Sequence, residues 1–320
     1  MPSRKSLQCV LIGGPTGSGK SQLALALARE LERLGGATII NSDSMQVYRS
    51  LRILTARPSE DEVQMAPHRL YGIFAGCEQC SAGRWRELAI QEIAMARDAG
   101  RLPIVVGGTG LYFQALTQGL AGVPNIPDNI RQKGRDRLAQ LGNIKFYDEL
   151  SNRDPISASR VQSSDRQRML RAWEVMEATG KSLVDWQSYG VQSNEEITPI
   201  AKIVLLPPRP SLYVKCNLRF KKMIAEGALE EVRQLLTEGI PQSHPLMKAV
   251  GVREIAWHLK GDTSLSEAIT SGQQATRRYA KRQMTWARNR MADWQKFNTQ
   301  DLESFLPKIF SFIRQFILTH

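Results

Sequence analysis

The feature that most constrains the fold is a glycine-rich segment near the N-terminus, which matches the phosphate-loop pattern G-x-x-x-x-G-K-[ST] in full. Its residues are Gly14, Pro15, Thr16, Gly17, Ser18, Gly19, Lys20 and Ser21. The apolar run 7–12 predicts a buried strand before it, and the Ala- and Leu-rich stretch 22–34 predicts a helix after it. A strand, this loop and a helix in succession form a site where backbone amides and a helix N-terminus bind phosphate.

The pattern assigns roles to two side chains of this loop. Lys20 is expected to bind the outer phosphate of a ligand, and Ser21 a Mg²⁺ ion attached to that phosphate. The alternative is a glycine-rich turn without a ligand. Many phosphate-loop ATPases also have a later apolar strand that ends in an aspartate. Here the strand predicted at 103–106 is followed by Gly-Gly-Thr, so a phosphate-bearing ligand is expected but ATP hydrolysis is not favoured.

Two further strands are predicted to deliver polar residues to the same crevice. Residues 37–40 form the first and lead to Asp43, and residues 103–106 form the second and lead to Thr109. The carboxyl ends of parallel strands line the ligand crevice, so both side chains can lie near the phosphate loop. Asp43 can hold Mg²⁺ or accept a proton, or it can simply cap the next turn.

The order of predicted elements indicates an α/β fold: a phosphate-loop NTPase-like core, with a parallel sheet flanked by helices, and an inserted all-helical domain. The core is assigned to 1–123 and 200–320, and the insertion to 124–199. A polar surface segment is expected at 58–70, and one long helix at 212–236 with Arg219 near its start. Helices are predicted in the insertion at 129–141, 145–150, 155–161 and 166–179.

The chain is basic, with 43 Lys and Arg against 31 Asp and Glu, which gives a net charge of +12. This excess suggests a polyanionic partner such as nucleic acid, although solubility alone can also explain it. A capping box, Ser264 with Glu267, predicts the start of a basic helix that reaches Arg290. Its cationic residues include the like-charged i,i+4 pairs Arg277/Lys281 and Arg278/Arg282, whose repulsion a bound phosphate backbone would relieve.

The remaining composition indicates a cytoplasmic protein. Cys77 and Cys80 form a single C-x-x-C without a second pair, so a structural zinc site is not expected. Few cysteines and no secretory signal fit a reducing cytoplasm. The apolar stretch 305–318 contains Pro307, Lys308 and Arg314 and predicts a packed C-terminal helix rather than a membrane span. We expect a monomer with no membrane association.

Several motifs together resemble the bacterial tRNA dimethylallyltransferases, also called tRNA isopentenyltransferases, the IPP transferase family. They occur in family order and extend over nearly the whole chain. The matching stretches are 14–21 (GPTGSGKS), 43–49 (DSMQVYR), 106–112 (VGGTGLY), 165–172 (DRQRMLRA), 248–253 (KAVGVR) and 275–283 (ATRRYAKRQ). The ordered set is far more specific than the phosphate loop alone.

The resemblance implies transfer of a dimethylallyl group from dimethylallyl diphosphate to N6 of the adenosine next to the anticodon, at tRNA position 37, in tRNAs that read codons beginning with U. It implies that the phosphate loop binds the donor diphosphate, with Mg²⁺, and that the anticodon stem-loop is held between core and insertion. Asp43 would be the general base, with Thr109 and Arg219 acting on the leaving group. Contacts to tRNA are implied for Asp43, Ser44, Met45, Gln46, Thr109, Arg131, Gln167, Arg168, Met169, Leu170, Arg171, Lys248, Ala249, Val250, Gly251, Val252 and Arg253.

Three alternatives stay open at the level of sequence. A nucleoside or nucleotide kinase shares the loop and an early aspartate but needs neither the basic helix nor the basic insertion. An isopentenyltransferase acting on free adenine nucleotides, or an RNA-binding protein with a vestigial loop, also fits parts of the pattern. The chain departs from the family at 53–58, where Leu54 and Arg57 replace the usual Gly and Lys.

Overall fold

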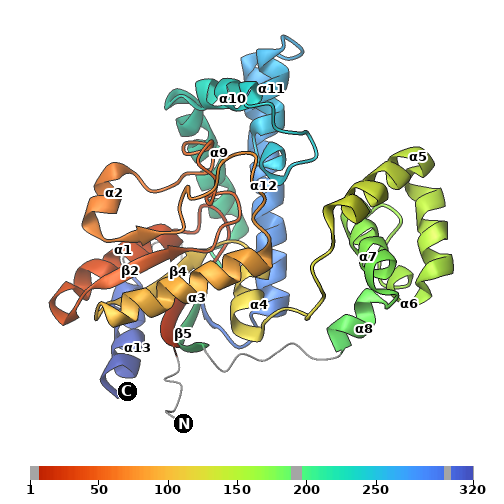
Figure 1. Ribbon diagram of the computed structural model, residues 1–320. Helices are drawn as coiled ribbons and strands as arrows, with labels where there is room; N and C mark the ends of the chain where they lie inside the picture. Colours follow the sequence, from red (N-terminus) through yellow and green to blue (C-terminus); the bar gives the residue numbers. More distant parts are fainter. Residues whose placement is uncertain (1–6, 189–196, 299–303, 320) are drawn as a thin grey trace. The chain divides into compact units, whose positions relative to one another are not determined.

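The computed structural model describes residues 7–188, 197–298 and 304–319 (Figure 1). The chain divides into two compact units. We call Met1–Thr117 together with Glu195–His320 the core unit, and Gln118–Asn194 the helical unit.

The core unit is organised around a sheet of six parallel strands in the order β3-β2-β4-β1-β5-β6. The strands are β1 (Leu7–Gly13), β2 (Ala37–Asn41), β3 (His68–Arg69), β4 (Leu102–Gly107), β5 (Ile197–Leu205) and β6 (Gln295–Phe297). Val10 of β1 lies opposite Ile104 of β4 and Ala201 of β5. Because the strands run in one direction, the loops after their carboxyl ends meet at a single edge.

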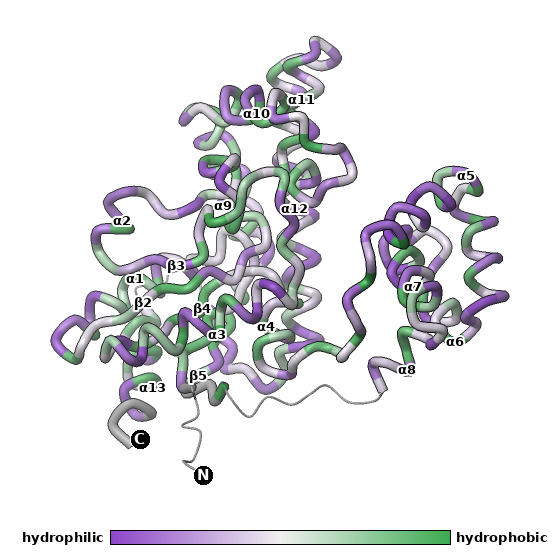
Figure 2. Tube along the Cα trace, in the orientation of Figure 1, coloured by the Kyte–Doolittle hydropathy of each residue, from purple (hydrophilic) through white to green (hydrophobic). Residues whose placement is uncertain are grey.

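Helices cover both faces of this sheet, which confirms the predicted α/β class. They are α1 (Lys20–Glu30), α2 (Glu60–Met65), α3 (Ala82–Asp98), α4 (Gly110–Gln118), α9 (Arg209–Ala225), α10 (Ala228–Thr237), α11 (Val252–Leu259), α12 (Leu265–Arg290) and α13 (Leu306–Thr319), with 3₁₀ turns at Glu32–Leu34 and Pro245–Lys248. Side chains alternate along a strand: Ile12 packs on the face of α1 and α13, whereas Leu11 packs on the face of α3, α4 and α12. Figure 2 shows hydrophobic residues gathered along the central strands.

Two predictions about the helices after β5 were wrong. The expected helix 212–236 is two helices, because Gly227 adopts a φ of 106° between α9 and α10. α9 begins at Arg209 and ends at Ala225, so Arg219 lies in its second half rather than near a helix start. The segment 58–70, predicted as a polar surface segment, is mostly exposed, and it also contains α2, which begins with a capping box of Ser59 with Glu62, and the short strand β3.

The helical unit consists of α5 (Asp128–Arg153), α6 (Pro155–Ala158), α7 (Arg166–Thr179) and α8 (Leu183–Ser188). Gly142 has a φ of 71° and interrupts α5, at the position where the sequence predicted a gap between two helices. The unit has its own small core, in which Leu138, Phe146 and Trp173 are buried. Lys133 and Arg153 lie over the Trp173 ring and both pair with Glu177, and α5 is largely hydrophilic (Figure 2).

Close packing of α12 on α9 gives a first testable prediction. A Cβ atom at Gly272 would lie 2.1 Å from Cζ of the buried Phe220 ring. Gly272→Ala should therefore destabilise the protein by about 1–3 kcal/mol, because the core must shift to admit a methyl group. Thermal unfolding of this variant is compared with that of Ser271→Ala, at the neighbouring exposed position. Equal melting temperatures for the two variants would contradict the packing argument.

Candidate active site

The phosphate loop joins β1 to α1, as the sequence predicted. Gly17 and Gly19 adopt φ values of 78° and 89°, in the left-handed region that glycine reaches without a steric cost. α1 begins at Lys20, whose Nζ donates a hydrogen bond of 3.2 Å to the carbonyl of Pro15. The loop thus folds back on itself and places the lysine ammonium inside it, where a phosphate would be bound.

A cavity of about 740 Å³ opens beside this loop. It collects many of the predicted site residues, although they come from distant parts of the sequence. These are Thr16, Gly17, Gly19, Lys20, Ser21, Asp43, Ser44, Met45, Gln46, Arg219, Lys248, Ala249 and Val250. The rest of the loop, Gly14, Pro15 and Ser18, forms its turn behind these residues.

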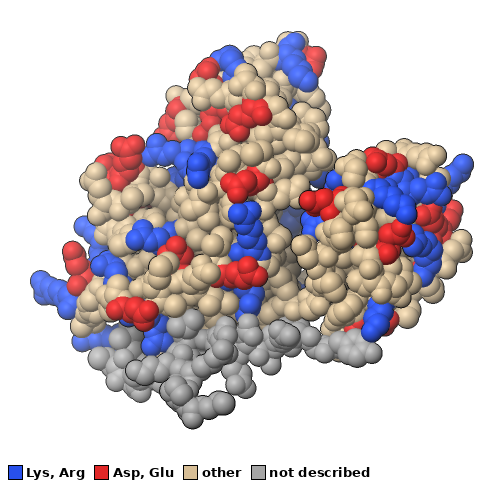
Figure 3. All heavy atoms as spheres, in the orientation of Figure 1, with Lys and Arg blue, Asp and Glu red and all other residues tan. Residues whose placement is uncertain are grey.

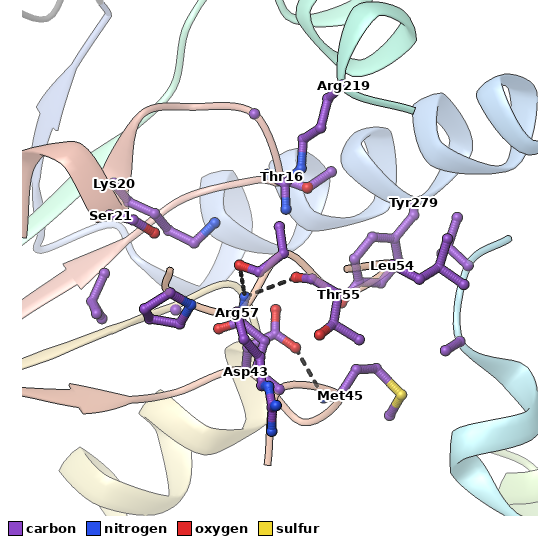
Figure 4. Close-up of a pocket in the computed structure, with 18 of the residues that line it drawn as sticks. Thr16, Lys20, Ser21, Asp43, Met45, Leu54, Thr55, Arg57, Arg219 and Tyr279 are labelled. Atoms are coloured by element: carbon purple, nitrogen blue, oxygen red, sulfur yellow. Dashed lines mark hydrogen bonds between the residues drawn. The ribbon is translucent and has the colours of Figure 1, made fainter. Parts of the chain in front are cut away.

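Three charged side chains point into the cavity from different elements (Figure 4). Lys20 comes from α1, Asp43 from the turn after β2, and Arg219 from α9. Burial lowers the pKa of Lys20 to about 8, the charge of Asp43 partly opposes this shift, and the charge of Arg219 adds to it. Burial also lowers the pKa of Arg219, again opposed by Asp43. Two positive charges in one desolvated cavity repel each other and raise the free energy of the empty site. The cavity therefore favours the binding of an anion.

The Asp43 carboxylate is held by a well-defined turn. The buried Asn41 side chain accepts a hydrogen bond from the Asp43 N–H (2.8 Å) and donates to the Asp43 carbonyl (3.0 Å) and to the Leu70 carbonyl (3.1 Å). Trp85 Nε1 donates to the Asn41 carbonyl (2.8 Å). Oδ1 of Asp43 accepts the N–H of Met45 (2.9 Å). Its Oδ2 has no hydrogen-bond partner among the described residues, so one carboxylate oxygen is available to a ligand.

Thr109 lies one layer behind the cavity wall. Its hydroxyl oxygen accepts the N–H of Ser44 (2.9 Å) and its hydroxyl hydrogen is directed to Ser44 Oγ (3.3 Å). Its own N–H donates to the Ser42 carbonyl (3.2 Å). Thr109 therefore holds the turn on both sides of Asp43, and Ser44, which its hydroxyl contacts, lines the cavity. The leaving-group role predicted for Thr109 stays a prediction.

Residues 54–58 form another part of the cavity wall, within the stretch where the sequence departs from the family pattern. The Glu231 carboxylate, from α10, accepts three successive backbone N–H groups at Arg52, Ile53 and Leu54. Gln46 Nε2 donates to the carbonyls of Thr55 (2.9 Å) and Ala56 (3.0 Å). The divergent residues Leu54 and Arg57 both line the cavity.

Several residues that line the cavity were not predicted as part of this site. They are Glu62, His68, Tyr71, Lys215 and Thr276, together with Tyr279 and Arg282 of the predicted basic helix. Lys215 was detectable, because it lies four residues before Arg219 and shares its helix face. Burial raises the pKa of Tyr71 and Tyr279, and in both the charge of Asp43 adds to the shift. Glu62 and His68 were not predicted to lie in the site, because the segment 58–70 was predicted to be a polar surface segment.

The motif 248–253 divides between the cavity and α11. Lys248, Ala249 and Val250 line the cavity, whereas Gly251 begins α11 with a φ of 97°. Val252 is buried, and the Arg253 guanidinium lies over the Trp257 ring and pairs with Glu254.

The remaining predicted tRNA contacts lie in the helical unit. Gln167 and Arg168 are exposed on α7, and Arg168 pairs with Asp165. Met169 is fully buried in the core of the unit, so its side chain faces away from solvent. The other residues are Leu170, which packs against that core, Arg171, which pairs with Glu174, and Arg131, which donates to the Ile126 carbonyl.

The surface agrees with the basic composition. On the face shown in Figure 3, Lys and Arg side chains are numerous over both units, with acidic side chains between them. Among the described helices, none is both long and apolar enough to cross a lipid bilayer.

Two family models match parts of this chain. A family model for IPP transferase matches residues 46–290, and one for Zeta toxin matches residues 1–64, which include the phosphate loop. The tRNA dimethylallyltransferase of Paramagnetospirillum magneticum is 47% identical over 314 residues, covering 98% of each chain. That of Phenylobacterium zucineum is 49% identical, covering 92% of this chain and 93% of the relative.

Solved structures agree. The full-length tRNA isopentenylpyrophosphate transferase of Bacillus halodurans superposes with a TM-score of 0.69 at 31% identity, covering 98% of each chain. A eukaryotic dimethylallyltransferase acting on tRNA superposes with a TM-score of 0.78 at 25% identity, covering 93% of this chain and 75% of that one. The extent of these matches shows that the chain belongs to the IPP transferase family.

Proposed function

We propose that the protein transfers a dimethylallyl group from dimethylallyl diphosphate to N6 of the adenosine at tRNA position 37, in tRNAs that read codons beginning with U. The observation that carries the proposal is the cavity in which Lys20 and Arg219 face Asp43. The two cations suit a diphosphate, and the carboxylate suits a proton acceptor. The core and the helical unit would both contact tRNA, and we expect a cytoplasmic monomer.

The reaction can be written from these residues. N6 of adenine attacks C1 of the donor, so the N6–C1 bond forms while the C1–O bond breaks and its electron pair passes to the diphosphate. An aromatic amine is a poor nucleophile and loses its proton only as the new bond forms, and Oδ2 of Asp43 would accept that proton. Lys20, Arg219 and the loop amides would stabilise the negative charge on the leaving diphosphate.

A Mg²⁺ ion is compatible with the residues present. Ser21 supplies a hydroxyl on the cavity wall and Asp43 a carboxylate, both of them hard oxygen ligands. Mg²⁺ usually keeps several waters and binds few protein groups beside a substrate's phosphates, so a large protein cage is not required. Ser21 would hold the ion on the donor, where it would neutralise diphosphate charge.

The target base must leave the stacked anticodon loop to reach Asp43. Lys248, Ala249 and Val250 form a wall near which an everted adenine could be bound, and Tyr279 on α12 offers an aromatic ring. Exposed cations such as Arg168 would hold tRNA phosphates.

The deciding experiment is incubation with dimethylallyl diphosphate, Mg²⁺ and unmodified tRNA, followed by mass analysis of the nucleosides. We expect N6-(dimethylallyl)adenosine at position 37 and release of diphosphate. Parallel reactions with AMP as acceptor, and with ATP plus a nucleotide, test the free-nucleotide transferase and the kinase. Phosphate transfer without any prenylated nucleoside would refute the proposal in favour of the kinase.

Contacts between arginines and phosphates predict a steep salt dependence of tRNA binding. The Kd for an anticodon stem-loop should rise by roughly tenfold or more between 50 and 200 mM salt, because each neutralised phosphate releases counterions. Arg168→Gln should reduce the slope of log K against log salt by about one. Arg33→Gln, at an exposed position outside every predicted contact, is the matched control and should leave the slope unchanged. A flat salt dependence would contradict this mode of binding.

A further inference from the structure

Gln283, on α12, forms hydrogen bonds to two separate loops of the core unit. Its Oε1 accepts the N–H of Thr16 in the phosphate loop (2.9 Å), and its Nε2 donates to the carbonyl of Gly108 after β4 (2.9 Å). These partners are 267 and 175 residues away in the sequence. A single amide side chain therefore bridges two of the loops at the cavity edge of the sheet.

The loops that Gln283 bridges are also in close contact with each other. A Cβ atom at Gly108 would lie 2.2 Å from Gln283 Nε2 and 3.2 Å from the carbonyl oxygen of Gly14. Glycine at 108 thus lets the backbone after β4 approach both the phosphate loop and the Gln283 amide. The bridge occupies the Thr16 N–H, so that amide is bound to the protein rather than offered to an anion.

The loop after β4 is in turn fastened to the turn that carries Asp43. The Thr109 N–H donates to the Ser42 carbonyl (3.2 Å), and the Ser44 N–H donates to Thr109 Oγ1 (2.9 Å). A Cβ atom at Gly107 would lie 2.0 Å from the Ser42 oxygen, so the two backbones are in direct contact. A continuous chain of hydrogen bonds therefore runs from the phosphate loop through Gln283 and Thr109 to both neighbours of Asp43.

Sheet order explains why such a bridge is needed. The phosphate loop follows β1 and Asp43 follows β2, but β4 lies between these strands. β4 pairs with both strands, with Gly13 opposite Gly107 and Asn41 opposite Val106, so the sheet fixes the spacing of the strand ends. Beyond these ends, the phosphate loop and the turn of Asp43 are connected through the loop after β4, which Gln283 joins to the phosphate loop.

We propose that Gln283 is a positioning residue, which fixes the diphosphate-binding loop at the distance from Asp43 that the transfer step requires. The inference rests on the proposed function. Bond formation at C1 and proton removal at N6 must occur together, so the donor and the base need a defined separation. A misplacement of about 1 Å can lower a rate by roughly 10²-fold without abolishing binding.

The test uses Gln283→Met, which retains most of the side-chain volume and removes both hydrogen bonds. Its matched control is Gln273→Met on the same helix, because Gln273 is also half-buried and donates to the backbone of α9 at Asn217 (3.1 Å), outside the bridged loops. We expect Gln283→Met to lower kcat by about 10²-fold, with little change in KM for donor or tRNA and in pyrophosphate affinity. Gln273→Met should keep the wild-type kcat, and both melting temperatures should fall by similar amounts.

A purely structural role for Gln283 would lower the melting temperature of Gln283→Met and leave the kcat of its folded fraction at the level of Gln273→Met. That result would overturn the inference while leaving the proposed function intact. A higher KM for the donor and a lower affinity for pyrophosphate, with an unchanged kcat, would also overturn it, because Gln283 would then act in binding. A wild-type protein that transfers no dimethylallyl group would instead remove the proposed function itself.

Discussion

Asp43→Asn should lower the rate of dimethylallyl transfer by about 10²–10⁴-fold, the usual contribution of a positioned general base. The asparagine side chain retains the shape of the aspartate and can still accept the Met45 N–H through Oδ1. It cannot take the proton that N6 must lose. Single-turnover transfer to an anticodon stem-loop measures the effect, with pyrophosphate affinity as a separate readout that we expect to change little.

The matched control for this variant is Asp61→Asn, an exposed aspartate on α2. It should transfer at the wild-type rate, since the change removes a carboxylate without touching the cavity. An Asp43→Asn protein that turns over at a near-normal rate would exclude Asp43 as the base. An equal loss in pyrophosphate affinity would indicate that the carboxylate acts mainly through the donor site.

Arg219→Ala should both weaken donor binding and slow transfer, with a loss in kcat of about 10²–10³-fold, typical of removing one strong electrostatic stabiliser. The guanidinium faces the cavity beside Lys20, and its charge would be needed most as the diphosphate leaves. Arg219→Lys, which retains the charge but not the planar fork, should recover part of the loss.

The control on the same helix is Lys222→Ala, which removes an exposed cation paired with Glu226 (3.5 Å). It tests whether any lost positive charge on α9 weakens donor binding. We expect wild-type kinetics from it in steady-state assays that vary donor and tRNA separately. If Arg219→Ala gave the same kinetics as Lys222→Ala, the leaving-group role of Arg219 would be refuted.

The parts of the site that the sequence predicted are those encoded locally. The phosphate loop is a contiguous motif between a strand and a helix, so its structure and the place of Lys20 follow from neighbouring residues. The position of Asp43 followed from a general rule about the carboxyl ends of parallel strands. Both side chains line the cavity, as these arguments required.

The features that could not be predicted depend on long-range contacts or on a single backbone angle. Glu231 binds the backbone at 52–54 across nearly 180 residues, and nothing in α10 alone indicates it. Gln283 stood within a recognised motif, but its two partners are visible only in the folded chain. The break at Gly227 was missed because one glycine does not disturb the surrounding helical periodicity.

The central position of β1 affects how the protein is made on the ribosome. Val10 pairs with Ala201 of β5, so about 190 further residues must be synthesised before that edge of β1 has its neighbour. At elongation speeds of about 5–20 residues per second, this takes roughly ten to forty seconds. During that interval the apolar strand β1 has one unpaired edge. Such an edge can pair with another chain and so promote aggregation. We therefore expect a chaperone to bind the nascent chain during translation.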